Sequence, residues 1–197
     1  MLNLALSGTD PVIFFESQKT YGIGEQFETE GVPRDYYETA EGEPAIRRKG
    51  SDITIITIGP VLYSGMSAAA ILKEKFGLEA EVIDLRFINP LNYDSLISSV
   101  QKTGRVVLAS DSVEKGSILH TVASNLTTLC FDDLDGPPAV IGSKIWITPA
   151  AEMEKEFFPQ PDWIISAIHE RILPLPNFNP TQNYKREEIS RLAKKGV

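Results

Sequence analysis

The 197-residue sequence contains one cysteine and two histidines, and this scarcity excludes several kinds of site. Cys130 alone cannot form an internal disulfide, and a lone cysteine fits a reducing compartment. His120 and His169 fall within helical patterns and have no acid or cysteine at the spacing of a metal site or catalytic triad. We therefore interpret both histidines as ordinary helix residues and Cys130 as a small buried apolar residue.

Basic residues and long apolar runs are also scarce. The 19 lysine and arginine residues stand against 27 aspartate and glutamate residues, so the net charge is −8. This charge argues against nucleic acid or an anionic membrane as a partner. No apolar run approaches the ~20 residues needed to cross a bilayer, and no basic region precedes the short apolar start. The sequence therefore predicts a cytoplasmic protein.

The basic residues that are present gather near the end of the chain. From Pro174 onward, five basic and two acidic residues give the tail a charge of +3, so the preceding residues carry −11. An irregular arm is expected over residues 174–180 and a short polar helix over residues 186–195. Two interpretations stay open: the helix is simply solvated, or the tail docks on an acidic neighbour.

Strand and helix patterns alternate regularly after residue 50. β-branched and apolar runs predict strands over residues 52–58, 80–85, 105–109 and 139–141. Apolar residues at spacings of three and four predict helices over residues 62–76, 92–104, 118–129 and 163–173. This alternation predicts the α/β class, with a mostly parallel open sheet in a three-layer α/β/α sandwich.

The region before residue 50 has a different character. Residues 11–15 form an aromatic and β-branched run that predicts a buried strand. Residues 17–50 show no sustained period, and such a long connection is uncommon within one domain. We therefore place a domain boundary here, with the regular domain beginning near Arg47. The apolar residues Phe14 and Phe15, and the helix bearing Trp163, are expected to form uncovered interface surface.

The loops that follow the strands of a parallel sheet are the usual place for a ligand. Residues 59–65 match neither a dinucleotide fingerprint nor a phosphate loop. Arg86, which follows the second strand of the alternating pattern, is able to grip a carboxylate or phosphate, but we favour a role in tying a loop or a subunit contact by hydrogen bonds. The residue types alone therefore predict no active site.

Five phrases, in order, resemble the β subunit of thiamine-diphosphate-dependent 2-oxo acid dehydrogenases. They lie at residues 10–16, 49–55, 81–86 with Pro90 and Leu91, 103–107 and 148–154. The resemblance covers residues 10–173 and implies a transketolase C-terminal-like fold. It divides the chain into the end of a preceding pyrimidine-binding domain with a linker (1–46), the transketolase C-terminal-like domain (47–173), and an irregular arm with a short basic helix (174–197).

The resemblance also implies a function. The parent enzyme, with thiamine diphosphate and Mg²⁺, decarboxylates a 2-oxo acid oxidatively and passes the acyl group to lipoamide. Its cofactor and catalytic residues belong to the α subunit and to the β subunit's N-terminal domain. We therefore expect this chain to be an excised portion that binds no cofactor and is inactive alone. Its implied partners are an α subunit or α-type domain, a β-subunit dimer mate and the lipoamide acyltransferase docking domain.

Charge directs the search for the docking face. Docking domains of this family tend to be basic, so the densest acids are the candidates: Asp132, Asp133, Asp135, Glu152 and Glu154. Arg86 is the candidate subunit contact. The sequence departs from the family pattern at residues 110–112, which read Ser-Asp-Ser where His-Glu-Ala is common, and in its longer tail.

Two alternatives stay open. The chain resembles, less closely, the C-terminal domain of a transketolase or deoxyxylulose-phosphate synthase. It also fits a freestanding anion-binding regulatory module that works through Arg86. The 2-oxo acid is left open among pyruvate, 2-oxoglutarate and a branched-chain acid.

Overall fold

The computed structural model describes residues 1–24, 26–27, 31 and 33–195. Within these residues the strands are β1 (Ala45–Arg48), β2 (Ile53–Thr57), β3 (Ala80–Asp84), β4 (Val106–Val113) and β5 (Ala139–Ser143). The α-helices are α1 (Leu2–Ser7), α2 (Val61–Phe76), α3 (Asp94–Thr103), α4 (Ile118–Leu129), α5 (Glu154–Phe157), α6 (Pro161–Arg171) and α7 (Arg186–Lys194). Short 3-10 turns are η1 (Gln18–Thr20), η2 (Phe131–Asp133) and η3 (Ala151–Met153).

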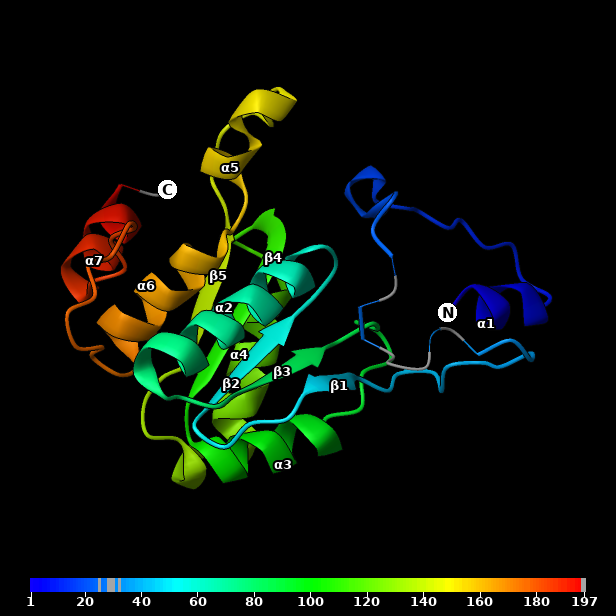
Figure 1. The fold of residues 1–197 in the computed structure, drawn as a ribbon, viewed down its shortest axis with the longest axis horizontal. Helices are drawn as coiled ribbons and strands as arrows, with labels where there is room; N and C mark the ends of the chain where they lie inside the picture. The colour runs from blue at the N-terminus through cyan, green and yellow to red at the C-terminus, as the bar shows by residue number, and fades with distance from the viewer. Residues whose placement is uncertain (25, 28–30, 32, 196–197) are drawn as a thin grey trace.

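The strands form one open sheet in the order β1-β3-β2-β4-β5 (Figure 1). β2 pairs in parallel with β3 and with β4, and β4 pairs in parallel with β5. β1 alone runs antiparallel, against β3. The prediction of a mostly parallel open sheet is therefore confirmed.

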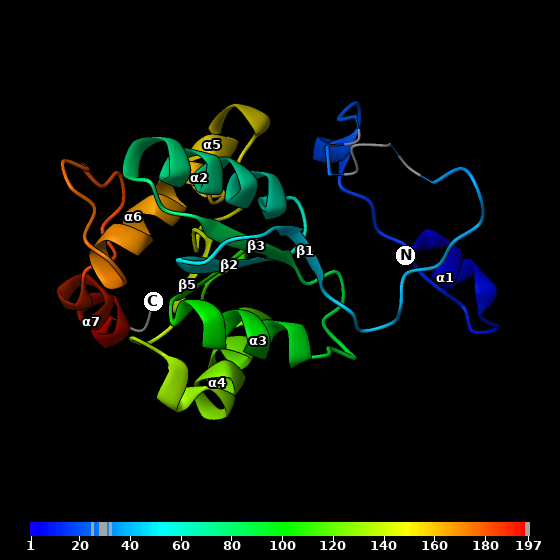
Figure 2. The same ribbon diagram turned by 60° about the horizontal axis from the view of Figure 1, so that its bottom comes forward.

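Helices cover both faces of the sheet (Figure 2). α2 and α6 pack on one face, and α3 and α4 pack on the other. Neighbouring residues of β2 point to opposite faces, so Ile55 joins the α2/α6 core and Ile56 joins the α3/α4 core. All five residues of β2 are buried, which makes this strand the centre of a three-layer α/β/α sandwich.

The helix ends follow the sequence signals. α2 ends at Gly77, which adopts a φ of 69° and donates its backbone N–H toward the carbonyls of Leu72 and Lys73. This left-handed C-terminal turn favours glycine because a side chain would be strained there. At the start of α4, the Ser117 hydroxyl accepts a hydrogen bond of 3.0 Å from the backbone N–H of Leu119.

Strand β1 was not expected from the sequence. Its four residues are mixed in polarity, and none is fully buried. Two ion pairs hold it at the sheet edge: Arg47 to Asp84 at 3.5 Å, and Arg48 to Glu79 at 3.1 Å. The strand therefore depends on pairing with β3 and on charge, neither of which leaves an apolar period in the sequence.

The buried strand expected at residues 11–15 is wrong. Residues 11–17, all of them described, form neither strand nor helix, and every residue from 11 to 16 is exposed. Phe15 is 90% exposed, as expected for an uncovered interface. The expectation of an uncovered helix around Trp163 is also wrong, because Trp163 and the isoleucines of α6 are buried.

The C-terminal strap (residues 174–185) packs across the α2/α6 face. Leu175 is buried there, and the ring of Phe178 meets that of Phe76 at a centroid distance of 6.1 Å. The backbone N–H of Thr181 donates to the Ser166 hydroxyl at 3.0 Å. α7 follows the strap and lies beside α6 (Figure 1). The irregular segment and the helix predicted after residue 173 are both present, and the irregular segment packs against the domain as the strap.

Within the described part of the chain, no helix has the length and apolar character needed to cross a membrane.

Candidate functional site

The loop after β5 projects from the carboxyl edge of the sheet (Figure 1). We call residues 144–160 the arm. Its two ends are joined by a hydrogen bond of 3.0 Å from the backbone N–H of Lys144 to the carbonyl of Phe157. The Phe157 ring is buried between those of Trp146 and Phe158, at centroid distances of 6.3 and 4.8 Å. Beyond this aromatic base, Ile147 is 94% exposed, so the arm presents apolar side chains to its surroundings.

Lys144 ties the base of the arm to the strap. Its Nζ donates to the Gln182 side-chain oxygen at 2.6 Å and lies 4.3 Å from the centre of the Trp163 ring. Burial lowers the pKa of Lys144, and the nearby Glu114 carboxylate opposes that shift. Sequence analysis missed this residue, because its three partners lie in separate parts of the chain.

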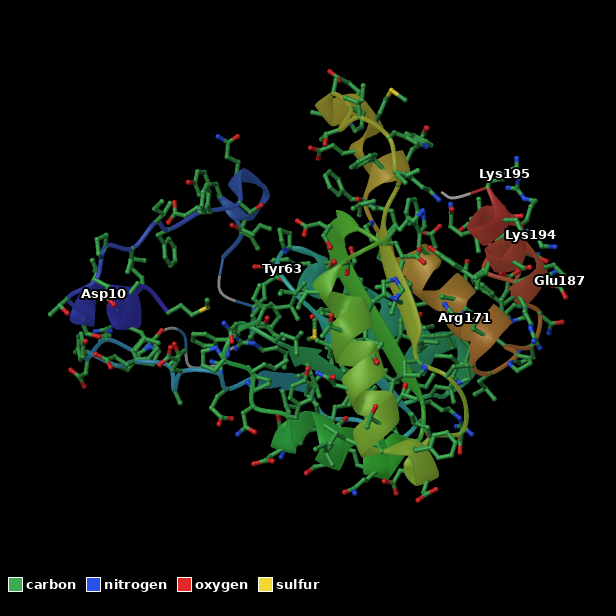
Figure 3. The ribbon with its side chains drawn as sticks, turned by 180° about the vertical axis from the view of Figure 1, so that it is seen from behind. Asp10, Tyr63, Arg171, Glu187, Lys194 and Lys195 are labelled. Carbon is green, nitrogen blue, oxygen red and sulfur yellow. The ribbon has the colours of Figure 1, made fainter. Side chains whose placement is uncertain are left out.

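A half-buried charged group lies behind the arm. Burial raises the pKa of Glu114, opposed by the positive charges of His120, Arg171 and Lys144. Arg171, on α6 beside the strap (Figure 3), also donates to the Pro138 carbonyl at 3.3 Å. Gly142 of β5 packs so tightly against the Glu114 backbone that an added Cβ would overlap it. The group is therefore fixed by the close pairing of β4 and β5.

Two hollows lie on either side of the arm. One, of about 240 Å³, is bordered by the start of α2, Asp111, Lys155 and Gln160. The other, of about 400 Å³, lies between the arm and the ends of β4 and β5 and also reaches Asp111. The Ser64 hydroxyl, which borders the first hollow, already donates a hydrogen bond of 3.1 Å to the Pro159 carbonyl. These walls offer scattered single polar groups and no convergent catalytic set.

Arg86 ties a loop, as the sequence favoured. Its Nε and Nη2 donate to the Glu43 carbonyl at 3.0 and 2.7 Å, and Nη2 also reaches the Pro44 carbonyl at 3.2 Å. Asn92 adds a bond of 2.7 Å from its side-chain nitrogen to the Glu43 carboxylate. At the end of β3, burial raises the pKa of Asp84, and the positive charge of Arg47 opposes that shift. The guanidinium is thus engaged where residues 43–44 lead into β1, which weakens the anion-binding alternative.

The candidate docking acids do not form one face. Asp132, Asp133 and Asp135 precede β5, whereas Glu152 and Glu154 follow it on the arm, so the strand separates the two groups (Figure 1). Asp135 is also engaged, because its carboxylate pairs with Arg105 at 3.0 Å. Sequence analysis treated the five acids together because charge density carries no information on the direction of the strand between them.

His169 and Cys130 have structural surroundings. The Nδ1 atom of His169 accepts a hydrogen bond of 2.8 Å from the backbone N–H of Leu175, which fastens the start of the strap. Cys130 is buried, and burial raises the pKa of its thiol, so it is a poor nucleophile. Among the described residues, no three acidic, histidine or cysteine side chains gather as a metal site would require.

The strand order and the helices on both faces define a class of protein: a three-layer α/β/α domain with a mostly parallel open sheet. The family model for the transketolase C-terminal domain matches residues 42–164. The chain belongs to this family.

Curated relatives extend the match beyond the domain. The chain is 37% identical to the 2-oxoisovalerate dehydrogenase subunit beta of Bacillus subtilis, over 86% of this chain and 51% of the relative. The acetoin:2,6-dichlorophenolindophenol oxidoreductase subunit beta of the same organism is 33% identical, over 86% of this chain and 48% of the relative. The pyruvate dehydrogenase E1 component subunit beta is 32% identical over 81% and 47%. The chain therefore spans about half the length of the curated relatives it matches.

A solved structure supports the fold alone. A split gene transketolase, solved as an inactive beta4 tetramer, superposes with a TM-score of 0.58 at 20% identity. The match covers 74% of this chain and 48% of that one.

Proposed function

We propose that this chain supplies the C-terminal domain of the β subunit in a thiamine-diphosphate-dependent 2-oxo acid dehydrogenase. The observation that carries the proposal is the 37% identity to the 2-oxoisovalerate dehydrogenase subunit beta, which extends over 86% of the chain. The three named relatives differ in substrate, so the resemblance supports the class of enzyme and leaves the 2-oxo acid open.

The residues of this chain do not fit the cofactor itself. Mg²⁺ and a diphosphate need converging oxygen ligands and phosphate donors. The hollows beside the arm instead offer Asp111 with isolated lysines, and the described residues contain no cluster of acidic or histidine ligands. In the proposed enzyme this domain would therefore position its neighbours, while another part of the assembly carries thiamine diphosphate, Mg²⁺ and the chemistry.

The contacts of Arg86 suggest how such positioning works. Three hydrogen bonds from the guanidinium hold residues 43–44, which lie immediately before β1. A domain attached through residues 1–42 would leave the sheet in a direction set by this loop. Arg86 would then be a positioning residue at the junction with the preceding domain or with a partner subunit.

For the lipoamide acyltransferase, we propose a docking site at the end of α4, around Asp132 and Asp133. Asp132 and Asp133 are exposed beside the apolar side chains of Leu129 and Phe131, whereas Asp135 is bound to Arg105. A basic docking domain would find charge and apolar surface together there. Partly exposed charge pairs of this kind contribute about 0.5–2 kcal/mol to binding.

A chimaeric enzyme tests the proposal. Residues 42–173 would replace the matching C-terminal region of the Bacillus subtilis 2-oxoisovalerate dehydrogenase subunit beta. We expect the chimaera to assemble with its partner subunit and to decarboxylate 2-oxoisovalerate, because under this proposal the exchanged region serves positioning and leaves the chemistry to the rest of the enzyme. The same chimaera with Asp132→Asn and Asp133→Asn should keep this activity and bind the acyltransferase more weakly.

Two results would contradict the proposal. One is a chimaera that folds, as judged by circular dichroism, but fails to assemble. The other concerns the unmodified chain, which should give no heat when titrated with thiamine diphosphate and Mg²⁺; binding in the low micromolar range would show that the cofactor site lies here.

A further inference from the structure

The last helix carries basic and apolar residues, and none of them is fully buried. Every residue of α7 keeps part of its surface exposed, including Ile189 at 41% and Leu192 at 37%. These two residues are three positions apart and so lie on one side of the helix. Lys194 and Lys195 stand at its end, on the outside of the molecule (Figure 3). α7 is therefore a short amphipathic helix with cationic residues beside an apolar pair.

The strap holds this helix in a fixed place. Directly before α7, the backbone N–H of Tyr184 donates to the Glu170 carboxylate, and the Tyr184 ring packs against the α2/α6 core. The Thr181 hydroxyl bonds to the Asp162 carboxylate at 2.5 Å. Burial raises the pKa of the Tyr184 hydroxyl, which is consistent with a deeply packed ring. These contacts connect the strap, and with it the start of α7, to α6.

Charge decides which partner suits α7. The chain before residue 174 carries −11, so an anionic membrane or a nucleic acid would repel most of the molecule. Two large apolar residues among the nine of α7 also give little area to insert into lipid. An acidic protein surface with exposed apolar side chains would complement both the lysines and the apolar pair of α7.

This chain itself carries such a surface. We call Leu129, Phe131, Asp132 and Asp133 the α4-end patch. Phe131 is 73% exposed and Leu129 is 54% exposed, while Cys130 between them is buried and anchors the turn. Among the residues that the structure describes, neither Asp132 nor Asp133 takes part in an ion pair. The α4-end patch thus offers apolar area and two carboxylates where α7 offers apolar area and lysines.

The two surfaces do not meet within one molecule. α7 lies beside α6, whereas η2 lies below it, at the lower end of the domain in Figure 1. The strap contacts hold α7 away from η2. We propose that α7 of one copy docks on the α4-end patch of a second copy. The contact would bring two exposed surfaces together and does not rest on the proposed enzyme function. If both proposals hold, α7 and the acyltransferase docking domain would compete for the α4-end patch.

Charge reversal on each side tests this pairing on the full chain. One variant carries Lys194→Glu and Lys195→Glu, and a second carries Asp132→Lys and Asp133→Lys. Sedimentation equilibrium of the wild type should show self-association that weakens between about 50 mM and about 500 mM NaCl, because exposed charge pairs are screened by salt. Each variant alone should associate at least about tenfold more weakly, a change that loss of several charge contacts produces.

Mixing the two variants gives the decisive measurement. An equimolar mixture of the two variants should recover association. The acidic tail of the first variant would pair with the basic patch of the second, and the native tail of the second would pair with the native patch of the first. A third variant, Glu152→Lys with Glu156→Lys, makes the same charge change on the arm and should associate as the wild type does. Three outcomes would overturn the proposal: a wild type that stays monomeric, a mixture that fails to recover, or a loss of association in the arm variant. Association that ignores salt and charge would point instead to Phe14 and Phe15.

Discussion

Two apolar segments of this chain have similar composition and opposite structures. Residues 11–15 and strand β2 are both rich in β-branched or aromatic residues, and both predict strands. β2 is buried throughout and pairs on both sides, with β3 and with β4. Residues 11–15 are exposed throughout and have no strand partner in the described chain.

The difference teaches that strand propensity expresses the fit to a neighbouring surface. A strand satisfies its backbone N–H and carbonyl groups only through adjacent strands, and a lone segment gains nothing from the extended form. In the 2-oxoisovalerate dehydrogenase subunit beta, about half of the length lies outside the match to this chain. Residues 11–15 have no such neighbouring strand among the described residues, so the two segments separate the effect of burial from that of composition.

The largest expected effect comes from truncating the same residue type in the two segments. Ile56→Ala removes a fully buried side chain from the α3/α4 core and should cost about 2–5 kcal/mol of unfolding free energy. Ile13→Ala makes the same chemical change at an exposed site and should stay within about 0.5 kcal/mol of the wild type. Urea denaturation of both variants measures the contrast. Equal losses would show that residues 11–15 are packed in solution.

The sequence predicted those features whose signal lies within one continuous segment. The strands β2 to β5, the helices α2, α3, α4 and α6, and the left-handed turn at Gly77 all followed from local period and capping. It could not predict β1, which is held by Arg47 and Arg48 pairing with residues more than 30 positions away. The predicted strand at residues 139–141 lies between Asp132 and Glu152, but the choice of docking acids rested on charge density alone and took no account of it.

The tail offers a second comparison, with a smaller expected effect. Phe178 of the strap packs between the rings of Phe76 and His169, at 6.1 and 5.5 Å, whereas Leu192 of α7 is partly exposed. Phe178→Ala should therefore cost about 1–3 kcal/mol, below the full range for a completely buried ring. Leu192→Ala should change unfolding by less than about 0.5 kcal/mol in dilute solution. A Phe178→Ala variant with wild-type stability would mean that the strap does not contribute to the core.

The smallest expected effect concerns Glu114, the half-buried carboxylate between β4, β5 and α6. Burial raises its folded pKa above the ordinary 4.5, and the charges of His120, Arg171 and Lys144 only partly oppose this. The folded state therefore binds this proton more tightly than the unfolded state does. Protonation stabilises the fold, and the wild type loses that stability as the pH rises from about 4.5 through the raised folded pKa. Above that window the ionised carboxylate keeps its desolvation cost.

Glu114→Gln removes this cost while keeping nearly the same shape. Its unfolding free energy should match that of the wild type below pH 4.5, where the wild-type side chain is protonated, and should exceed it at neutral pH. Urea denaturation across this pH range gives the difference directly. Glu152→Gln, on the exposed arm, is the matched control for the loss of one negative charge. A Glu114→Gln variant that is less stable than the wild type at neutral pH would show that attraction to Lys144 and Arg171 outweighs burial, and that the charged group behind the arm stabilises the pairing of β4 with β5.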